Sequence, residues 1–252
     1  MNEKLLNLIL EISRRMIEAG AEIHRVEESL ERLCLAYDVT RVDVYATTFN
    51  VIVSVENGDG SLLTHTCRIK QTGTDIERLH RLNDLVRRIC KTTPTCEEIR
   101  MELDRACAAK RYSPWIIVLF YGVIAAAFCL FFGGHSLSEV ATALIIGLIV
   151  GLLHKGCEHF GFNRLFARFL CSFTACLAAF LAQKTGLISS VDRVIIGNIM
   201  TLIPGIGLTN SLRDLFTGDS ITGILRSIEA ILLALAIACG YILTALMFGG
   251  AL

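Results

Sequence analysis

One apolar run decides the fold of this chain: WIIVLFYGVIAAAFCLFFGG, residues 115–134, which contains no charged side chain. A helix needs about 20 apolar residues to cross the hydrocarbon core of a bilayer, so this run is long enough to span it. Further stretches with few charges follow it in series, which disfavours the alternative of a soluble all-helical core. We predict about five membrane-spanning helices, over residues 115–133, 138–154, 167–184, 193–210 and 228–249.

The charged side chains are concentrated before this run. Residues 1–114 hold 17 of the 24 Lys and Arg and 18 of the 24 Asp and Glu in the chain of 252 residues. The remaining residues carry too little charge to cover the surface of a soluble domain. We therefore expect a cytosolic α+β domain over residues 1–112 and a transmembrane helical domain over residues 113–252. The formal net charge is zero, so electrostatics gives no support for a nucleic-acid partner.

The first domain alternates helical and extended patterns. Apolar residues recur at helical spacing over residues 5–16 and 23–37. β-branched runs then predict three antiparallel strands, with a hairpin turn at Asn57-Gly58-Asp59-Gly60 between the last two. Two more helices should follow, each opened by a capping box. These boxes pair Thr74 with Glu77 and Thr95 with Glu98.

The loop charges predict the orientation in the membrane. If the first domain is inside, seven basic residues face the inner side and two face the outer side, as the positive-inside rule requires. The inner residues are Lys110, Arg111, Lys155, Arg164, Arg168, Arg213 and Arg226, and the outer ones are Lys184 and Arg193. The N-terminus lacks the apolar core of a signal peptide, so we expect a multi-pass protein of the inner (plasma) membrane with a cytoplasmic first domain.

The ten cysteines contain no CxxC pair and are spread through both halves of the chain. Without paired ligand spacing we expect reduced thiols and neither a metal site nor a cofactor.

The fourth predicted span is interrupted at Pro204-Gly205. Proline removes a backbone donor, and a broken helix at membrane depth is tolerated where it is buried in protein or lines a wet cavity. Transporters bind substrates at such breaks, although a packing kink without a ligand is the alternative. The candidate substrate-binding residues are Asn198, Thr201, Pro204, Gly205, Thr209, Asn210 and Arg213.

Charged residues after the break are candidates for ion coupling. Arg213 could bind a substrate carboxylate through its planar guanidinium group, or it could pair with Asp214 or Asp219. Glu229 is the one acidic residue of the fifth span and could carry a proton, or it could form an interfacial pair with Arg226. The ion-coupling candidates are therefore Asp214, Asp219 and Glu229.

In the cytosolic domain, Glu22, His24, Arg25 and Glu27 gather at the start of one helix. An acid, a base and a histidine could support hydrolysis, but a solvated charged helix face is the simpler interpretation. The chain lacks GxSxG, HExxH and GxxxxGK[ST] motifs, and the absence of the last one argues against an ATP-driven pump.

Gly147 and Gly151 form a GxxxG pair in the second predicted span. Two glycines on one helix face let a neighbouring backbone approach closely, so we predict a helix-packing role for them.

Three segments together resemble the threonine/serine exporter family, specifically its N-terminal module. They are GAEIHRVEESL at residues 20–30, AAAFCLFFGG at residues 125–134 and GNIMTLIPGIGLTNSLRDLFTGDSITGILRSIEA at residues 197–230. The resemblance implies a secondary exporter of threonine, serine or related carboxylates, driven by an ion gradient and not an enzyme.

The chain ends at Leu252, directly after the fifth predicted span, which resembles the two-protein form of that family. The resemblance then implies a separate small membrane subunit as partner, and a dicarboxylate such as succinate as an alternative substrate. Assembly as a homo-oligomer stays open. The competing hypotheses are a membrane-anchored hydrolase and a ligand-sensing module, both built on the cytosolic domain.

Overall fold

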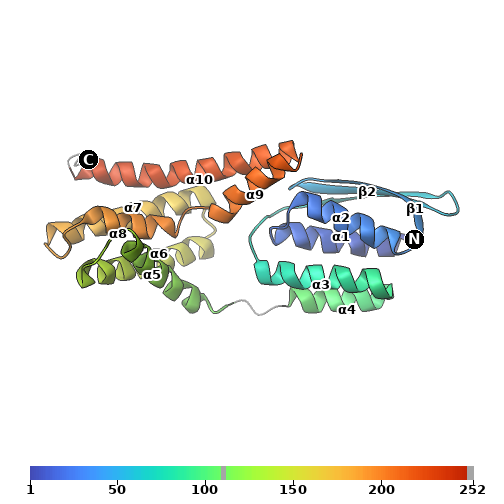
Figure 1. Ribbon diagram of the computed structural model, residues 1–252, viewed down its shortest axis with the longest axis horizontal. Helices are drawn as coiled ribbons and strands as arrows, with labels where there is room; N and C mark the ends of the chain where they lie inside the picture. Colours follow the sequence, from blue (N-terminus) through green and yellow to red (C-terminus); the bar gives the residue numbers. More distant parts are fainter. Residues whose placement is uncertain (109–111, 249–252) are drawn as a thin grey trace. The chain divides into compact units, whose positions relative to one another are not determined.

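The computed structural model describes residues 1–108 and 112–248, which form two compact units (Figure 1). The N-terminal unit comprises Met1–Lys110 and Asn210–Leu225, and the membrane unit comprises Arg111–Thr209 and Arg226–Leu252. The segment Asn210–Leu225 thus groups with the first unit, although the boundary expected from sequence assigned it to the second. Lys110 and Arg111, and the end of the last predicted span at Gly249, lie outside the described residues.

Two amphipathic helices form the centre of the N-terminal unit. Helix α1 (Glu3–Glu18) and helix α2 (Ile23–Leu35) bury their apolar faces in one core, where Leu6, Ile9 and Leu30 have no exposed surface. Such complete burial of large aliphatic side chains stabilises the folded unit through the hydrophobic effect. The N-terminal unit therefore has the core of an ordinary water-soluble domain.

Gly20 joins the two helices in a left-handed conformation, with a φ of 95°. A Cβ at this position would lie 2.6 Å from the carbonyl oxygen of Gly73, so only glycine fits here. The backbone N–H of Gly73 donates in turn to the carbonyl oxygen of Glu18, which fixes the turn against the later segment.

Three antiparallel strands form one sheet in the order β1-β2-β3, as the sequence predicted (Figure 1). The central strand β2 buries Val51, Val53 and Val55 completely, while the intervening residues are partly exposed. This alternation turns one face of the sheet toward the helices and the other toward solvent. The strands are β1 (Val39–Ala46), β2 (Asn50–Asn57) and β3 (Leu62–Arg68).

Helices α3 (Ile76–Thr92) and α4 (Cys96–Cys107) lie on the opposite side of α1 and α2 from the sheet, which gives three layers (Figure 1). The capping box at Thr95 and Glu98 is confirmed. The predicted box at Thr74 and Glu77 is wrong, because Asp75 is the N-cap and its carboxylate accepts from the backbone N–H of Arg78 at 3.0 Å.

Six helices make up the rest of the described chain. Four of them are long and apolar enough to cross a membrane, and α8 and α9 together would form a fifth span bent by 57° at a short break. The helices are α5 (Pro114–Phe131), α6 (Leu137–His159), α7 (Arg164–Lys184), α8 (Val191–Met200), α9 (Gly205–Phe216) and α10 (Ser220–Met247). Helices α6 and α7 are longer than the predicted second and third spans, and α10 begins earlier than the predicted fifth.

The spanning helices expose large apolar side chains that a soluble protein would cover. Only 28–39% of each candidate span is buried inside the protein, and Leu137 and Phe131 are 84% and 78% exposed. Exposed apolar surface on this scale requires an apolar solvent, which lipid provides. The chain is a multi-pass membrane protein.

Small residues let α5 approach two neighbours closely. A Cβ at Gly147 of α6 would lie 2.7 Å from the carbonyl oxygen of Tyr121, and a Cβ at Gly197 of α8 would lie 2.7 Å from that of Ala125. The packing role predicted for the GxxxG pair is confirmed, since Gly151 also lies against Tyr121.

Candidate functional site

The interruption at Pro204 separates two helices. Helix α8 ends at Met200, and α9 begins at Gly205. Proline has no N–H to continue the helical hydrogen bonds, and the backbone N–H of Gly205 donates instead to the carbonyl oxygen of Ile203 at 2.9 Å. The carbonyl end of one helix and the amide end of the next therefore meet at this break, where polar backbone groups lack regular helical partners.

Asn198 lies one turn before the break and is 1% exposed. Its amide Nδ2 donates to the carbonyl oxygen of Val194 at 2.9 Å. Its Oδ1 is buried and has no hydrogen-bond partner among the residues that the structure describes. Burying an unsatisfied carbonyl oxygen is costly, so this atom is available to a donor that enters the site.

The other polar side chains at the break are turned back on their own helices. Thr201 Oγ1 donates to the carbonyl oxygen of Asn198 at 2.7 Å, and Thr209 Oγ1 donates to that of Gly205 at 3.1 Å. Thr201 and Asn210 are half-buried, and Thr209 is exposed. Of the predicted substrate-binding residues, Asn198 is thus the most deeply buried polar group.

Arg213 of α9 is paired with a residue far away in sequence. Its Nη1 lies 2.8 Å from Oε1 of Glu22, at the start of α2, and both belong to the N-terminal unit. The Arg213 side chain is 53% exposed and that of Glu22 is 21% exposed. The pairing with Asp214 or Asp219 considered from the sequence is therefore not the one seen at Arg213.

The same face of the N-terminal unit brings Glu27 close to Asp219. Glu27 Oε1 accepts a hydrogen bond from the backbone N–H of Ala46 at 2.8 Å. Burial raises the pKa of Glu27 above its usual range, and the negative charge of Asp219 adds to this effect. Asp214 is 1% exposed, and Glu27 and Asp219 are half-buried. All three acidic side chains are therefore partly or fully withdrawn from water.

The remaining candidates of the N-terminal unit do not converge on one centre. His24 Nε2 lies 3.3 Å from Glu28, and Arg25 Nε lies 3.6 Å from Glu22, and both side chains are mostly exposed. A hydrolytic site needs its acid, base and nucleophile within hydrogen-bond reach of one another, and this arrangement lacks that geometry. Within residues 1–108 and 112–248, no three His, Cys, Asp or Glu side chains gather to hold a metal ion.

Glu229 of α10 pairs across the membrane unit with Arg164 of α7, at 3.7 Å between Oε1 and Nη1. The pair with Arg226 considered from the sequence is not the one seen at this carboxylate. Both partners are more than half exposed, which is the geometry of an interfacial pair.

Glu139 of α6 was missed by the sequence reasoning and is 1% exposed. Its Oε1 accepts from the backbone N–H of Ser190 at 3.1 Å, and its Oε2 lies 3.5 Å from Nη1 of Arg193. The available signal was its position as the first charged residue after a long apolar run, two residues into a predicted span. An ionisable residue inside a spanning helix is a functional candidate by default.

A family model described as "Putative threonine/serine exporter" matches residues 7–249 of this chain. The chain belongs to this family. The match covers both units, so family membership rests on the soluble core and on the spanning helices together.

Several curated relatives match over nearly the whole chain. "Pheromone-regulated membrane protein 10" of Kluyveromyces lactis is 22% identical over 96% of this chain and 26% of its own length. "Probable threonine/serine exporter" of Mycobacterium tuberculosis is 25% identical over 96% of this chain and 46% of its own length. "Probable succinate transporter subunit YjjP" of Klebsiella aerogenes is 24% identical over 96% of this chain and 93% of its own length.

The chain therefore spans about a quarter to a half of the length of the first two relatives and nearly all of the third. No solved structure matches the chain.

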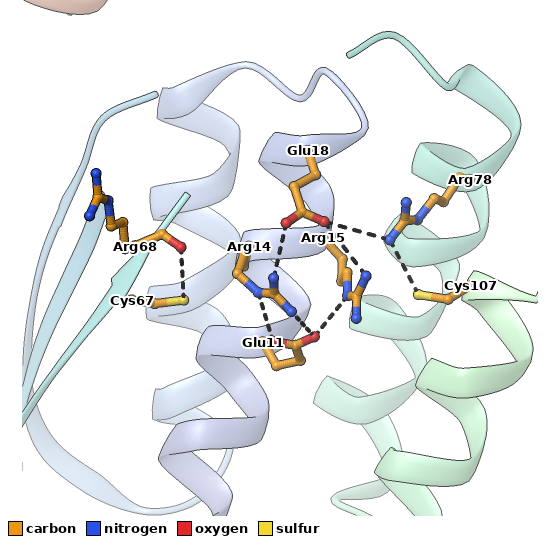
Figure 2. A network of polar contacts seen from close by, with 8 residues as sticks. All are labelled: Glu11, Arg14, Arg15, Glu18, Cys67, Arg68, Arg78 and Cys107. Carbon is orange, nitrogen blue, oxygen red and sulfur yellow. Dashed lines mark hydrogen bonds and ion pairs between the residues drawn. The ribbon is translucent and has the colours of Figure 1, made fainter. Parts of the chain in front are cut away.

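This exporter-family chain also has a polar network between α1 and α3 in its N-terminal unit (Figure 2). Glu11 accepts from Nε of Arg14 at 2.8 Å and from Nε of Arg15 at 2.7 Å. Burial acts to raise the pKa of Glu11, but the hydrogen bonds and the positive charges of the two arginines together outweigh it and hold that pKa below its usual range. Glu18 continues the network to Arg78 of α3 at 3.8 Å, so the network fastens α3 to α1.

Proposed function

We propose that this chain is a membrane component of a secondary exporter of small amino acids, such as threonine or serine, or of dicarboxylates such as succinate. The observation that carries the proposal is the broken α8–α9 span in a member of the exporter family, with the buried, unpartnered Oδ1 of Asn198 beside it. Broken spans are where many secondary transporters bind their substrates.

The chemistry of the break suits an amino acid, which carries both signs of charge, better than a dicarboxylate. The amide end of α9 favours a carboxylate, because the unpaired N–H groups and the helix dipole attract negative charge. Asn198 Oδ1 and the carbonyl end of α8 accept hydrogen bonds, as an ammonium or hydroxyl group would donate them. Pro204, Gly205, Thr201, Thr209 and Asn210 would shape this site.

The proposal also includes the orientation of the protein in the membrane. The N-terminal unit faces the cytoplasm, because that orientation puts most basic loop residues inside. Arg213 would then lie at the inner end of the broken span, where an exported anion enters, and Glu22 would compete with that anion for the guanidinium group.

A second membrane subunit completes the transporter in this proposal. Support comes from the similarity of this chain to a relative named as a succinate transporter subunit, over 93% of that relative's length. Coupling to a proton or other ion gradient needs a carboxylate that can change its charge, and Asp214, Asp219 and Glu229 are the candidates predicted from the sequence. Asp214 and Asp219 are the stronger candidates of these three, since Glu229 is mostly exposed.

Efflux measurements test the proposal. Cells that lack the protein should accumulate threonine, serine or succinate, and proteoliposomes should export the same solute when the small subunit is present. Asn198→Ala should lower this flux and leave membrane insertion intact. Thr174→Ala is the matched control, because Thr174 lies in a span and its hydroxyl donates to the carbonyl oxygen of Leu170 in its own helix.

Normal levels and normal efflux of all three solutes would refute the exporter proposal. Flux by this chain alone would refute the need for a second subunit. Equal flux in the Asn198 and Thr174 variants would move the substrate site away from the break.

The second candidate function is ligand sensing by the N-terminal unit. It is favoured by an open hollow of about 730 Å³ in this unit, which lies between α1 and α4. Its lining combines basic side chains with an equal number of acidic ones, which suits a ligand that carries both signs of charge. These residues are Lys4, Arg15 and Arg100 and Glu11, Glu97 and Asp104. A thermal shift of the protein on adding threonine, serine or succinate, with no flux of any of them, would favour this function over export.

A further inference from the structure

The described part of the membrane unit contains four acidic side chains, and only one of them is buried. Glu158, Asp192 and Glu229 are exposed, whereas the Glu139 side chain is 2% exposed. A buried charge in a membrane protein is costly to keep, so it persists where it is paired or where function requires it.

The pairing of Glu139 is asymmetric. Arg193 is 44% exposed, so the cation can move into solvent while the carboxylate cannot. The two oxygens of Glu139 have one contact each, at 3.1 and 3.5 Å, which leaves part of their accepting capacity unused. If Arg193 moves away, the carboxylate becomes an unpaired buried charge, and binding a proton removes that charge.

Within the part of the chain that the structure describes, Arg193 is the basic side chain that forms an ion pair with Glu139. The thiol of Cys129 on α5 lies within electrostatic range of both Glu139 and Arg193. Arg193 of α8 is therefore the group that controls the charge of Glu139.

We propose that Glu139 binds the proton that is exchanged for the exported solute, and that Arg193 is released when it does. This inference rests on the proposed export function. A proton from the aqueous side adds to Oε2, the neutral carboxyl keeps its bond to the Ser190 N–H through Oε1, and Arg193 becomes free to bind an anion or water. Loss of the proton to the opposite side restores the ion pair.

Infrared titration of the purified full-length protein tests proton binding without any need for a substrate. The absorption of a protonated buried carboxyl should appear as the pH is lowered. It should be lost in Glu139→Gln and retained in the matched control Glu158→Gln, which changes an exposed residue of the same helix. An unchanged absorption in Glu139→Gln overturns the proposal.

Arg193→Gln is a second variant, which keeps the carboxylate and removes its cation. The carboxyl absorption should then appear at a higher pH than in the wild type. An unchanged pH midpoint of this absorption would contradict the proposal that Arg193 stabilises the charged form of Glu139. This variant decides the question if Glu139→Gln does not fold.

Transport measurements distinguish a role of Glu139 in proton coupling from a purely structural role. In proteoliposomes with the small subunit, Glu139→Gln should lose threonine, serine or succinate flux driven by a pH gradient and retain exchange at equal pH. A merely structural Glu139 would lose both, and retained pH-driven flux would overturn the proposal. If the wild type moves none of the three solutes, the export function fails, while the infrared titration still decides whether Glu139 binds a proton.

Discussion

The contact between α5 and α6 depends on the missing side chain of Gly147. A Cβ at this position would lie 2.7 Å from the carbonyl oxygen of Tyr121 and 2.8 Å from Gly122 Cα, and ordinary contact begins at 3.4 Å. Both obstructing atoms are backbone, so no change of rotamer relieves the overlap and the helices must separate by several tenths of an ångström. We expect Gly147→Ala to cost about 1–3 kcal/mol of stability from overpacking.

Gly156→Ala provides the matched control on the same helix, because a Cβ at Gly156 meets nothing within 4 Å. This substitution should be neutral or stabilise by up to about 1 kcal/mol through helix propensity. Gly151→Ala should fall between the two, since a Cβ there would meet Tyr121 Cβ at 3.0 Å and Val118 Cα at 3.2 Å, which is a milder overlap than at Gly147.

Unfolding of the detergent-solubilised variants, followed by circular dichroism as denaturing detergent is added, measures the difference. A Gly147 variant as stable as the Gly156 variant would refute the reasoning, because it would mean that α5 and α6 are not in close contact.

Three further predictions concern the N-terminal unit. The Glu22–Arg213 pair should contribute at most about 1 kcal/mol in a double-mutant cycle because Arg213 is half exposed, so an export defect in Arg213→Ala without one in Glu22→Gln would assign Arg213 to the substrate. Thr95→Ala and Asp75→Ala should each lower the free energy of unfolding by about 1 kcal/mol, because each removes an N-cap. Thr74→Ala should lower it less, and equal losses of stability at Thr74 and Asp75 would contradict Asp75 as the N-cap of α3. Burial raises the pKa of the Cys34 thiol from 9.0 to about 12. The unfolded chain therefore releases this proton at a lower pH than the folded one, and the folded state loses stability as the pH rises from 9 toward 12. Cys34→Ala should lessen this loss of stability, and an unchanged pH profile of stability would contradict the assignment to Cys34.

Much of the fold could be predicted from the sequence because its signals are local. The apolar runs located the spanning helices, and Pro204-Gly205 located the break between α8 and α9. The Thr95 capping box succeeded for the same reason, since both of its partners lie within one helical turn. The Thr74 box failed because the adjacent Asp75 offers an equally good cap, and spacing alone cannot choose between neighbours.

The pairing of charges could not be predicted, because it depends on residues distant in sequence. Glu229 has Arg226 one turn ahead of it, yet it pairs with Arg164 of another helix. Arg213 has two nearby aspartates, yet it pairs with Glu22 of the other end of the chain. Helical spacing shows which partners are available, but the tertiary fold decides which one is used.

Glu139 illustrates how packing creates a candidate site that composition cannot reveal. In sequence it is a single carboxylate at the edge of an apolar run, and its partner Arg193 lies 54 residues further on. Its burial requires α5, α6 and α8 to pack closely, and Gly147 and Gly197 allow that packing by bringing the backbones of α6 and α8 against α5. The glycines and the buried ion pair therefore belong to one structural arrangement, in which tight helix contacts exclude the water that would otherwise screen Glu139 from its arginine.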